Sequence, residues 1–223
     1  MPSIDKWKNK TTRGEDKAIT TINRYRQKTI SLPRFTEDKR LWGYPGLAGT
    51  AKQLASLVPK CNYYIEPFAG TVKVFQELSK DRYETAILND KSEFIYNWLM
   101  QEFSKDAYIF NVDFIPMMSR FKGVESAFQL IDAPWNRSFY DQGYSCFNRK
   151  NIKDYDNEIL EQLSGFRGEF IICTKKDNKR MLDSDYDNYL VEGDYLVFGK
   201  TPKTLVTTNM KLPKGLNNVT RIE

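Results

Sequence analysis

The sequence predicts an α/β fold with a mostly parallel sheet, helices on both faces and an antiparallel hairpin near its C-terminal end. From about Leu41 onwards, short apolar strand patterns alternate with single helical stretches. Strands joined by single helices form largely parallel sheets covered on both faces. The last two strand patterns are separated by a short segment that contains Gly199 and Pro202, which is typical of a hairpin.

The first predicted strand is Tyr63-Tyr64-Ile65, which ends at the turn Glu66-Pro67-Phe68-Ala69-Gly70 and leads into a helix over 71–80. The same alternation then repeats and predicts, in order, a strand over 85–88, a helix over 92–103, a strand over 108–112, a helix over 115–121 and a strand over 127–131. After a polar, aromatic loop we expect a helix over 154–163, a strand over 169–174 and the hairpin strands 195–198 and 204–207.

The 223 residues include no histidine. This excludes Ser-His-Asp and Cys-His nucleophile systems, a histidine general base and any metal site built with histidine. The three cysteines are widely spaced and form no C-x-x-C pair, so neither a disulfide framework nor a zinc cluster is expected. Chemistry must therefore depend on carboxylates, backbone groups, aromatic rings, amides or a cofactor.

The composition suits one domain of ordinary size, because 40% hydrophobic residues are enough to build a core. No apolar run approaches the ~18 residues that a transmembrane helix needs. The charged residues near the N-terminus contain no hydrophobic signal-peptide stretch. The chain is therefore expected to be cytoplasmic, with no membrane partner.

The positive charge is concentrated in residues 1–40, which we call the basic arm. The arm carries eleven basic and five acidic side chains, a net charge of +6, whereas the predicted domain 41–223 carries −1. Basic side chains neutralise phosphates and release counterions, and the aromatic content of 14% suits stacking on nucleobases. The alternative is a solvated tail that only aids solubility. If the arm binds nucleic acid, its candidate residues are Lys6, Lys8, Lys10, Arg13, Arg24 and Arg26.

Candidate ligand-binding residues follow the first two predicted strands, at the edge where open α/β sheets bind their ligands. The turn Glu66 to Gly70 precedes a helix, so that backbone amides can approach a ligand closely. Asp90 ends the next strand, twenty residues beyond Gly70, the spacing at which an acidic side chain binds ribose hydroxyls in nucleotide-binding folds. The alternative for Asp90 is a cap for the following helix.

Two further features follow the third and fourth strands. Asp113-Phe114 can hold an adenine ring through a carboxylate and an aromatic contact, and the alternative for Asp113 is a helix N-cap. The turn Asp132-Ala133-Pro134-Trp135 suits an exocyclic amino group on a planar base. Asp132 and the Ala133 carbonyl can accept its two N–H groups while Trp135 stacks on the ring, which makes the amino nitrogen more electron-rich without any histidine.

These motifs resemble, in order and spacing, the Dam-type family of S-adenosylmethionine-dependent DNA adenine-N6 methyltransferases over roughly residues 42–174. Each short motif has its counterpart. Tyr44-Pro45-Gly46 is similar to the opening Y-P-G-G-K element, Ile65 to Gly70 to the E-P-F-A-G cofactor loop, Leu88 to Asp90 to L-N-D, Asp113-Phe114 to D-F, and Asp132 to Trp135 to the catalytic D-P-P-Y. Residues 168–174 with 177–178 are similar to the stretch G-K-F-hydrophobic-S and N-D that usually follows.

The resemblance implies a Rossmann-like methyltransferase fold with S-adenosylmethionine as cofactor and no metal. The methionine part of the cofactor would lie on the backbone of the loop and near the opening element, which together comprise Glu66, Pro67, Phe68, Ala69 and Gly70 with Tyr44, Pro45 and Gly46. Asp90 would bind the ribose, and Asp113 with Phe114 would bind the adenine of the cofactor.

The resemblance further implies a site-specific, adenine-specific DNA methyltransferase of the kind found in DNA modification and restriction–modification. The catalytic residues would be Asp132, Ala133, Pro134 and Trp135, acting on a base that is flipped out of the duplex. DNA is then the partner, and the loop 136–150 would contact it through Arg137, Arg149 and Lys150.

The sequence departs from the family pattern in its cofactor-binding elements. Ala48 stands where the opening element has lysine, with Lys52 one helical turn later, and Val72 stands where a second loop glycine is usual. In the catalytic motif Ala133 and Trp135 replace proline and tyrosine, but they keep a carbonyl and a stacking face.

The spacing of the motifs leaves little room for a separate target-recognition domain, because only 61 residues separate Gly70 from Ile131. Sequence recognition would then fall to the basic arm, the loop 136–150 or a separate partner. Two other functions stay open: the same chemistry on RNA, whose adenine methyltransferases also use a D-x-P-W motif, and a non-catalytic nucleic-acid-binding subunit that keeps the fold.

Overall fold

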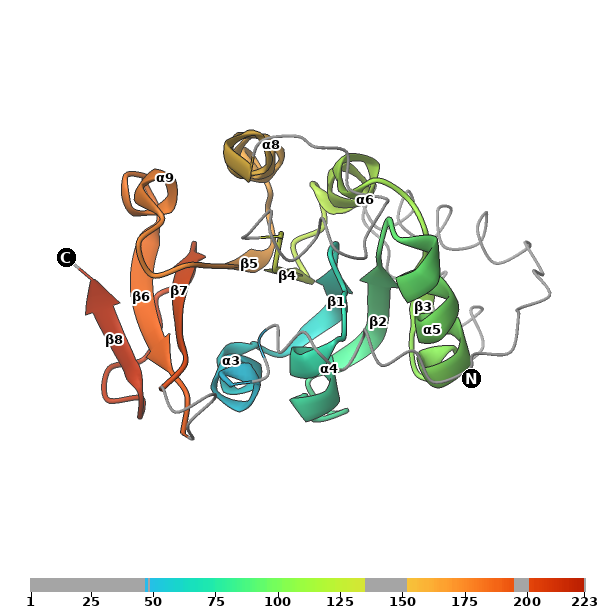
Figure 1. Ribbon diagram of the computed structural model, residues 1–223, viewed down its shortest axis with the longest axis horizontal. Helices are drawn as coiled ribbons and strands as arrows, with labels where there is room; N and C mark the ends of the chain where they lie inside the picture. The colour runs from blue at the N-terminus through green and yellow to red at the C-terminus, as the bar shows by residue number, and fades with distance from the viewer. Residues whose placement is uncertain (1–46, 48, 135–151, 195–200, 223) are drawn as a thin grey trace.

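The computed structural model describes residues 47, 49–134, 152–194 and 201–222. These residues form an eight-stranded sheet with the strand order β3-β2-β1-β4-β5-β7-β6-β8 (Figure 1). The basic arm, the loop 136–150 and the predicted strand 195–198 lie outside the described residues. The sheet confirms the predicted α/β class.

Five strands form the parallel part of the sheet, and each of the first four is followed by a helix. The strands are β1 (Cys61–Glu66), β2 (Tyr83–Asn89), β3 (Tyr108–Phe110), β4 (Ala127–Ile131) and β5 (Glu169–Thr174). The helices between them are α4 (Lys73–Glu77), α5 (Glu93–Phe103), α6 (Phe114–Phe121) and α8 (Ile152–Leu163), and α3 (Ala51–Leu57) precedes β1. The strand order reverses between β1 and β4. The helix after β1, α4, covers one face of the sheet, and the helix after β4, α8, covers the other.

The antiparallel part of the sheet contains three strands, β6 (Asp187–Glu192), β7 (Lys203–Thr208) and β8 (Val219–Ile222), with the short helix α9 (Lys179–Leu182) before β6. The prediction of a strand over 204–207 is confirmed by β7. β7 pairs with β5 along one edge and with β6 along the other.

Helices cover both faces of the sheet, as the sequence predicts. The helices α3, α4 and α5 lie on one face, and α6, α8 and α9 lie on the other (Figure 1). The alternation of side chains along each strand supplies both cores: Tyr64 packs with the α3–α5 side, whereas Tyr63 and Ile65 pack with α6. None of the helices in the described part of the chain is long and apolar enough to cross a bilayer.

Helix α4 is shorter than the predicted helix over 71–80, because the chain before it has a left-handed conformation. Gly70 has φ +50°, and Val72, which precedes the first residue of α4, has φ 47° and ψ 39°. A β-branched residue in this region is strained by about 1–2 kcal/mol. The side chain of Val72 is only 1% exposed, so its burial offsets that cost. Valine therefore keeps the backbone conformation that the family's second glycine would adopt freely.

This conformation predicts an unusual order of stability for two variants. Val72→Gly removes more apolar surface than Val72→Ala, but glycine alone adopts this φ without strain. We expect Val72→Gly to be the more stable variant by about 1 kcal/mol in urea unfolding. Val74, which is equally buried but lies within α4, is the control, and there the alanine variant should be more stable by about 1 kcal/mol. The same order at both positions would contradict a left-handed Val72.

Candidate functional site

The residues singled out in the sequence meet at the carboxyl ends of β1, β2, β3 and β4, which lie side by side in the sheet. The order of the strands reverses between β1 and β4, and ligands of open α/β sheets bind at such a switch point. The loop after β1 and the turn after β4 flank this point. The loops after β2 and β3 lie further along the same edge.

Asn89, the last residue of β2, forms hydrogen bonds with the loops that follow β1 and β3. Its side chain is 0% exposed. The amide nitrogen donates to the carbonyls of Pro67 (2.9 Å) and Val112 (3.1 Å), and the amide oxygen accepts from the Val112 amide (3.1 Å). These contacts end β3 at Phe110, before the predicted boundary at Val112. Sequence reasoning treated Asn89 only as part of a motif, although a polar side chain at the end of a buried strand was a signal for such a role.

Asp90 holds the β1 loop against the start of α5. Its carboxylate oxygens accept from the backbone amides of Gly70 (2.9 Å) and Ser92 (2.8 Å). Burial raises the pKa of Asp90 to about 6, while both amide hydrogen bonds lower it. Ser92 is the N-cap of α5. The carboxylate therefore lies beside the loop and organises its backbone.

Glu66 extends away from the loop and into the core beside α4. It is 3% exposed and accepts a hydrogen bond from the Tyr64 hydroxyl at 2.5 Å. Burial and, to a smaller extent, the nearby charge of Asp132 raise the pKa of Glu66, and the hydrogen bonds from Tyr64 and from the Phe75 backbone lower it, so that the net pKa is about 8. At neutral pH the carboxyl group is therefore mostly protonated in the folded protein.

The raised pKa predicts how stability depends on pH. Between the ordinary pKa of 4.5 and about 8, the unfolded chain loses the Glu66 proton and the folded chain keeps it, so this group makes folding less favourable as pH rises. Glu66→Gln should remove that penalty, which is on the order of a few kcal/mol. We expect urea unfolding to show Glu66→Gln gaining stability over the parent at pH 8 and little at pH 5. Glu77→Gln, on the exposed face of α4, should show no such change.

Asp113 and Phe114 lie after β3, at the start of α6. The Asp113 carboxylate caps α6 by accepting from the Ile115 amide (3.2 Å), and it forms a salt bridge with Lys91 (2.8 Å). Phe114 is 5% exposed, and its ring packs 4.8 Å from that of Phe68. Phe68 is the more exposed ring of the two, so it presents more aromatic surface to a ligand than Phe114 does.

The turn Asp132-Ala133-Pro134 follows β4 directly. Asp132 is partly exposed, while Ala133 and Pro134 are buried. The register of β1 and β4 pairs Ile65 with Gln129, which puts Asp132 on the same sheet face as Glu66, and the charge of Asp132 raises the pKa of both Glu66 and Cys173. The two carboxyl groups on either side of the switch point are therefore electrostatically coupled.

The residues at β1, β2 and β3 fit a bound nucleoside such as that of S-adenosylmethionine. A Cβ atom built on Gly70 would meet no other atom within 4 Å, so the loop borders open space. Asp90 supplies a carboxylate beside that loop, and Phe68 supplies an aromatic surface. Two of the loop amides already have partners within the protein, since Ala69 donates to the Asn89 carbonyl (2.8 Å) and Gly70 to Asp90.

Several predicted site residues lie outside the described part of the chain. They are Tyr44, Pro45 and Gly46 of the opening element, Trp135 of the catalytic motif, and the nucleic-acid-binding candidates Lys6, Lys8, Lys10, Arg13, Arg24, Arg26, Arg137, Arg149 and Lys150. Lys52, the proposed substitute for the missing lysine, lies exposed in the first turn of α3.

One protein family matches the chain. The model of the D12 class N6 adenine-specific DNA methyltransferases aligns with residues 50–162, just over half of the chain. This region includes β1 to β4, the loop after β1 and the Asp132 turn. No curated protein resembles the chain closely enough in sequence to count as a relative.

Solved structures share the fold at low sequence identity. Protein LPL1258 from Legionella pneumophila is 13% identical, with a TM-score of 0.50 over 76% of this chain and 88% of that one. An rRNA methylase from Streptococcus thermophilus is 12% identical, with a TM-score of 0.45 over 73% and 95% of the two chains. TrmK from M. capricolum, solved with S-adenosylhomocysteine, is 12% identical, with a TM-score of 0.43 over 71% and 66%.

Proposed function

The chain belongs to the D12 class of N6 adenine-specific DNA methyltransferases, and on that premise we propose that it methylates the exocyclic amino group of adenine in DNA. Methyl transfer is the activity of the family, and S-adenosylmethionine is its methyl donor. The observation that carries the finer proposal is the turn Asp132-Ala133-Pro134, which follows β4 beside the switch point and next to the cofactor loops. This turn supplies the hydrogen-bond acceptors that an amino group needs.

On the donor side, the chain binds and orients the cofactor. S-adenosylmethionine, when bound, supplies an electrophilic methyl group. Asp90 would hold its ribose, Phe68 and Phe114 its adenine, and the open face at Gly70 would accommodate the methionine part. Asn89 acts indirectly, because it fixes the backbone of the loops that carry these groups.

On the acceptor side, the chain positions the amino group. Asp132 and the Ala133 carbonyl would accept the two N–H groups of adenine and direct the nitrogen lone pair toward the methyl group. Pro134 restricts the backbone of the turn. Correct positioning can contribute several kcal/mol to a two-substrate transfer, and the proton leaves to solvent after transfer. The target base must be flipped out of the duplex, since its amino nitrogen is otherwise unreachable.

The division of the chain into a basic arm (1–40) and a catalytic domain (41–223) is part of this proposal. The arm's charge of +6 favours binding to DNA phosphates. Deleting residues 1–38 should therefore weaken DNA affinity and reduce the slope of log K against log salt, as measured by fluorescence anisotropy. An unchanged salt slope would assign the arm to solubility alone.

The test of the proposed function is transfer of a labelled methyl group from S-adenosylmethionine to unmethylated duplex DNA, followed by mapping of the modified base. Single-stranded DNA and RNA are assayed in parallel. N6-methyladenine in duplex DNA would support the proposal, and transfer only to RNA would replace the substrate. No transfer together with no cofactor binding by calorimetry would favour a non-catalytic nucleic-acid-binding subunit.

A further inference from the structure

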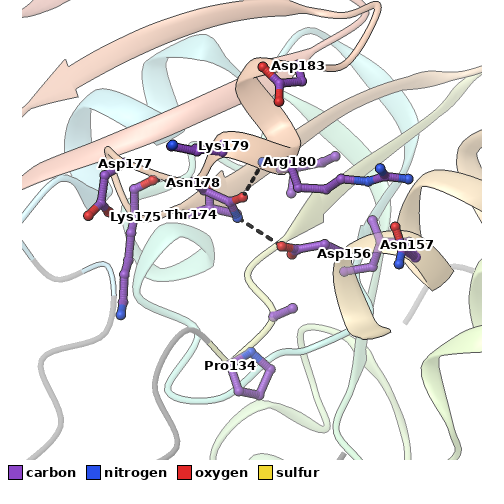
Figure 2. A pocket seen from close by; sticks show the side chains of 13 residues that line it. Pro134, Asp156, Asn157, Thr174, Lys175, Asp177, Asn178, Lys179, Arg180 and Asp183 are labelled. Carbon is purple, nitrogen blue, oxygen red and sulfur yellow. Dashed lines mark hydrogen bonds between the residues drawn. The ribbon is translucent and has the colours of Figure 1, made fainter. Parts of the chain in front are cut away.

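A cavity of about 620 Å³ lies at the carboxyl ends of β4 and β5, between α8 and α9. Ala133 and Pro134 form part of its wall on the β4 side. Figure 2 shows Asp156 and Asn157 on α8, Lys175 and Asn178 on the segment that joins β5 to α9, and Lys179 and Arg180 on the first turn of α9. We call this the α8–α9 cavity, and its size is that of a small-molecule or nucleotide site.

In strand order, the cavity lies on the other side of β4 from the cofactor loops, and Ala133 and Pro134 of the turn after β4 form part of its wall. The cofactor loops follow β1, β2 and β3, whereas β5 lies on the other side of β4 in the sheet. Asp132 stands between these two groups of strands, since it follows β4. A transfer that is directed by Asp132 needs its donor on one side and its acceptor on the other. The cofactor loops account for the donor, and the border of the cavity lies on the other side of β4 from them.

Exposed cations border the cavity. Lys175, Lys179 and Arg180 line it, and Lys176 is exposed beside them. Among the residues that the structure describes, the salt bridges involve Lys80, Lys91, Arg167, Lys203 and Arg221, and none involves Lys175 or Lys179. The acidic Asp177 and Asp183 also lie on the border without a salt bridge to these lysines in that part of the chain.

A hydrogen bond holds the two walls of the cavity in place. The Asn178 side-chain nitrogen donates to Asp156 of α8 at 3.0 Å, and its oxygen caps α9 by accepting from the amides of Arg180 and Met181. Asp156 is 7% exposed. Burial raises its pKa, and the charge of Arg180 opposes that shift, so Arg180 already interacts with Asp156. In the described part of the chain, neither Lys175 nor Lys179 takes part in a salt bridge.

We propose that Lys175 and Lys179, at the border of the α8–α9 cavity, bind phosphates of the DNA strand that carries the methylated adenine. This inference rests on the proposed function, because it takes a DNA strand as the acceptor. Lysine binds phosphates as a compact charge without strict geometry, which suits contacts to a backbone rather than to a particular base. Another cavity, bordered by Lys211 and Lys214, does not fit this role, since the chain after β7 returns to the amino end of β5, beside Gly168.

The experiment compares two double variants of equal charge. Lys175→Gln/Lys179→Gln removes the proposed contacts, and Lys211→Gln/Lys214→Gln removes two exposed lysines from the other end of the sheet. Affinity for a short duplex is measured by anisotropy over a range of salt concentrations, and cofactor affinity by calorimetry. Each phosphate contact adds about 0.9 to the salt slope, so the first variant should lose a slope of about 2 and bind about 50-fold more weakly at 0.1 M salt. The second variant should bind DNA as the parent does.

The possible outcomes distinguish the assignment of Lys175 and Lys179 from the proposed function. Equal loss in both double variants, or no loss in the first, would overturn the assignment of Lys175 and Lys179 while leaving the proposed function intact. A parent protein that neither binds nor methylates DNA would overturn both, and binding to RNA alone would also overturn the assignment to a DNA strand. Lys175→Arg/Lys179→Arg should retain the affinity of the parent, which distinguishes lost charge from a damaged fold.

Discussion

Asp132→Ala is expected to reduce methyl transfer to DNA by roughly 1,000-fold or more, the size of effect seen when a group that stabilises or positions the reacting atoms is removed. The variant leaves the Ala133 carbonyl and the cofactor loops in place but removes the carboxylate that would direct the amino nitrogen. Cofactor affinity should stay within a few-fold of the parent, because Asp132 lies on the far side of the switch point from Asp90. Single-turnover transfer of labelled methyl, together with calorimetry, measures both quantities.

The matched control is Asp106→Ala, an exposed aspartate at the opposite end of the sheet, where it follows α5 and precedes β3. Its loss should affect neither transfer nor cofactor affinity. Full transfer by Asp132→Ala would remove this residue from the mechanism. A loss of cofactor binding that parallels the loss of transfer would instead place Asp132 in the cofactor site.

Asn89→Ala should destabilise the protein and weaken cofactor binding together. The substitution removes three hydrogen bonds made by a side chain that is itself fully buried, and it leaves two carbonyls and one amide without their partner. Each buried polar group left in this way costs about 1–3 kcal/mol, so the free energy of unfolding should fall by about 3–5 kcal/mol. Urea unfolding and calorimetry with S-adenosylmethionine measure the two effects.

Asn111→Ala is the neighbouring control. Its side-chain nitrogen donates to the Asp90 carbonyl at 2.8 Å, but Asn111 is exposed, so water can replace the lost bond. The expected loss of stability is below about 1 kcal/mol. If Asn89→Ala proved as mild as Asn111→Ala, the loops after β1, β2 and β3 would have to be held in place by other contacts.

The sequence was sufficient to predict the central strands and the order of the site elements. β4 and β5 have the predicted boundaries, because their apolar runs are buried on both faces and are followed by turn residues. The carboxyl ends of parallel strands meet at one edge of the sheet. Motifs that are far apart in the chain could therefore be predicted from the sequence to lie close together. For the same reason Asp90, at the end of β2, could be expected near the loop that ends at Gly70.

The remaining elements depended on contacts that sequence patterns do not record. β6 was missed because its buried polar residue, Asn188, looks like a loop residue, although its side chain bonds to Thr207 in the neighbouring strand. β8 is a short edge strand with exposed residues at its centre. The burial of the Glu66 carboxyl group depends on its hydrogen bond with Tyr64, two residues earlier on the same face of β1. The cavity between α8 and α9 depends on a hydrogen bond between residues 22 positions apart in the chain.

The insertion of β7 between β5 and β6 has a consequence for the order in which the protein can fold. β7 lies between β5 and β6 in the sheet, yet the ribosome synthesises it after both of them. During synthesis, until Thr208 has left the ribosome, β5 has an open edge that exposes the backbone of Ile171, Ile172 and Cys173. Open apolar edges promote pairing between chains. Until β7 is complete, the nascent chain is therefore expected to be more prone to pairing with other chains than the finished sheet is.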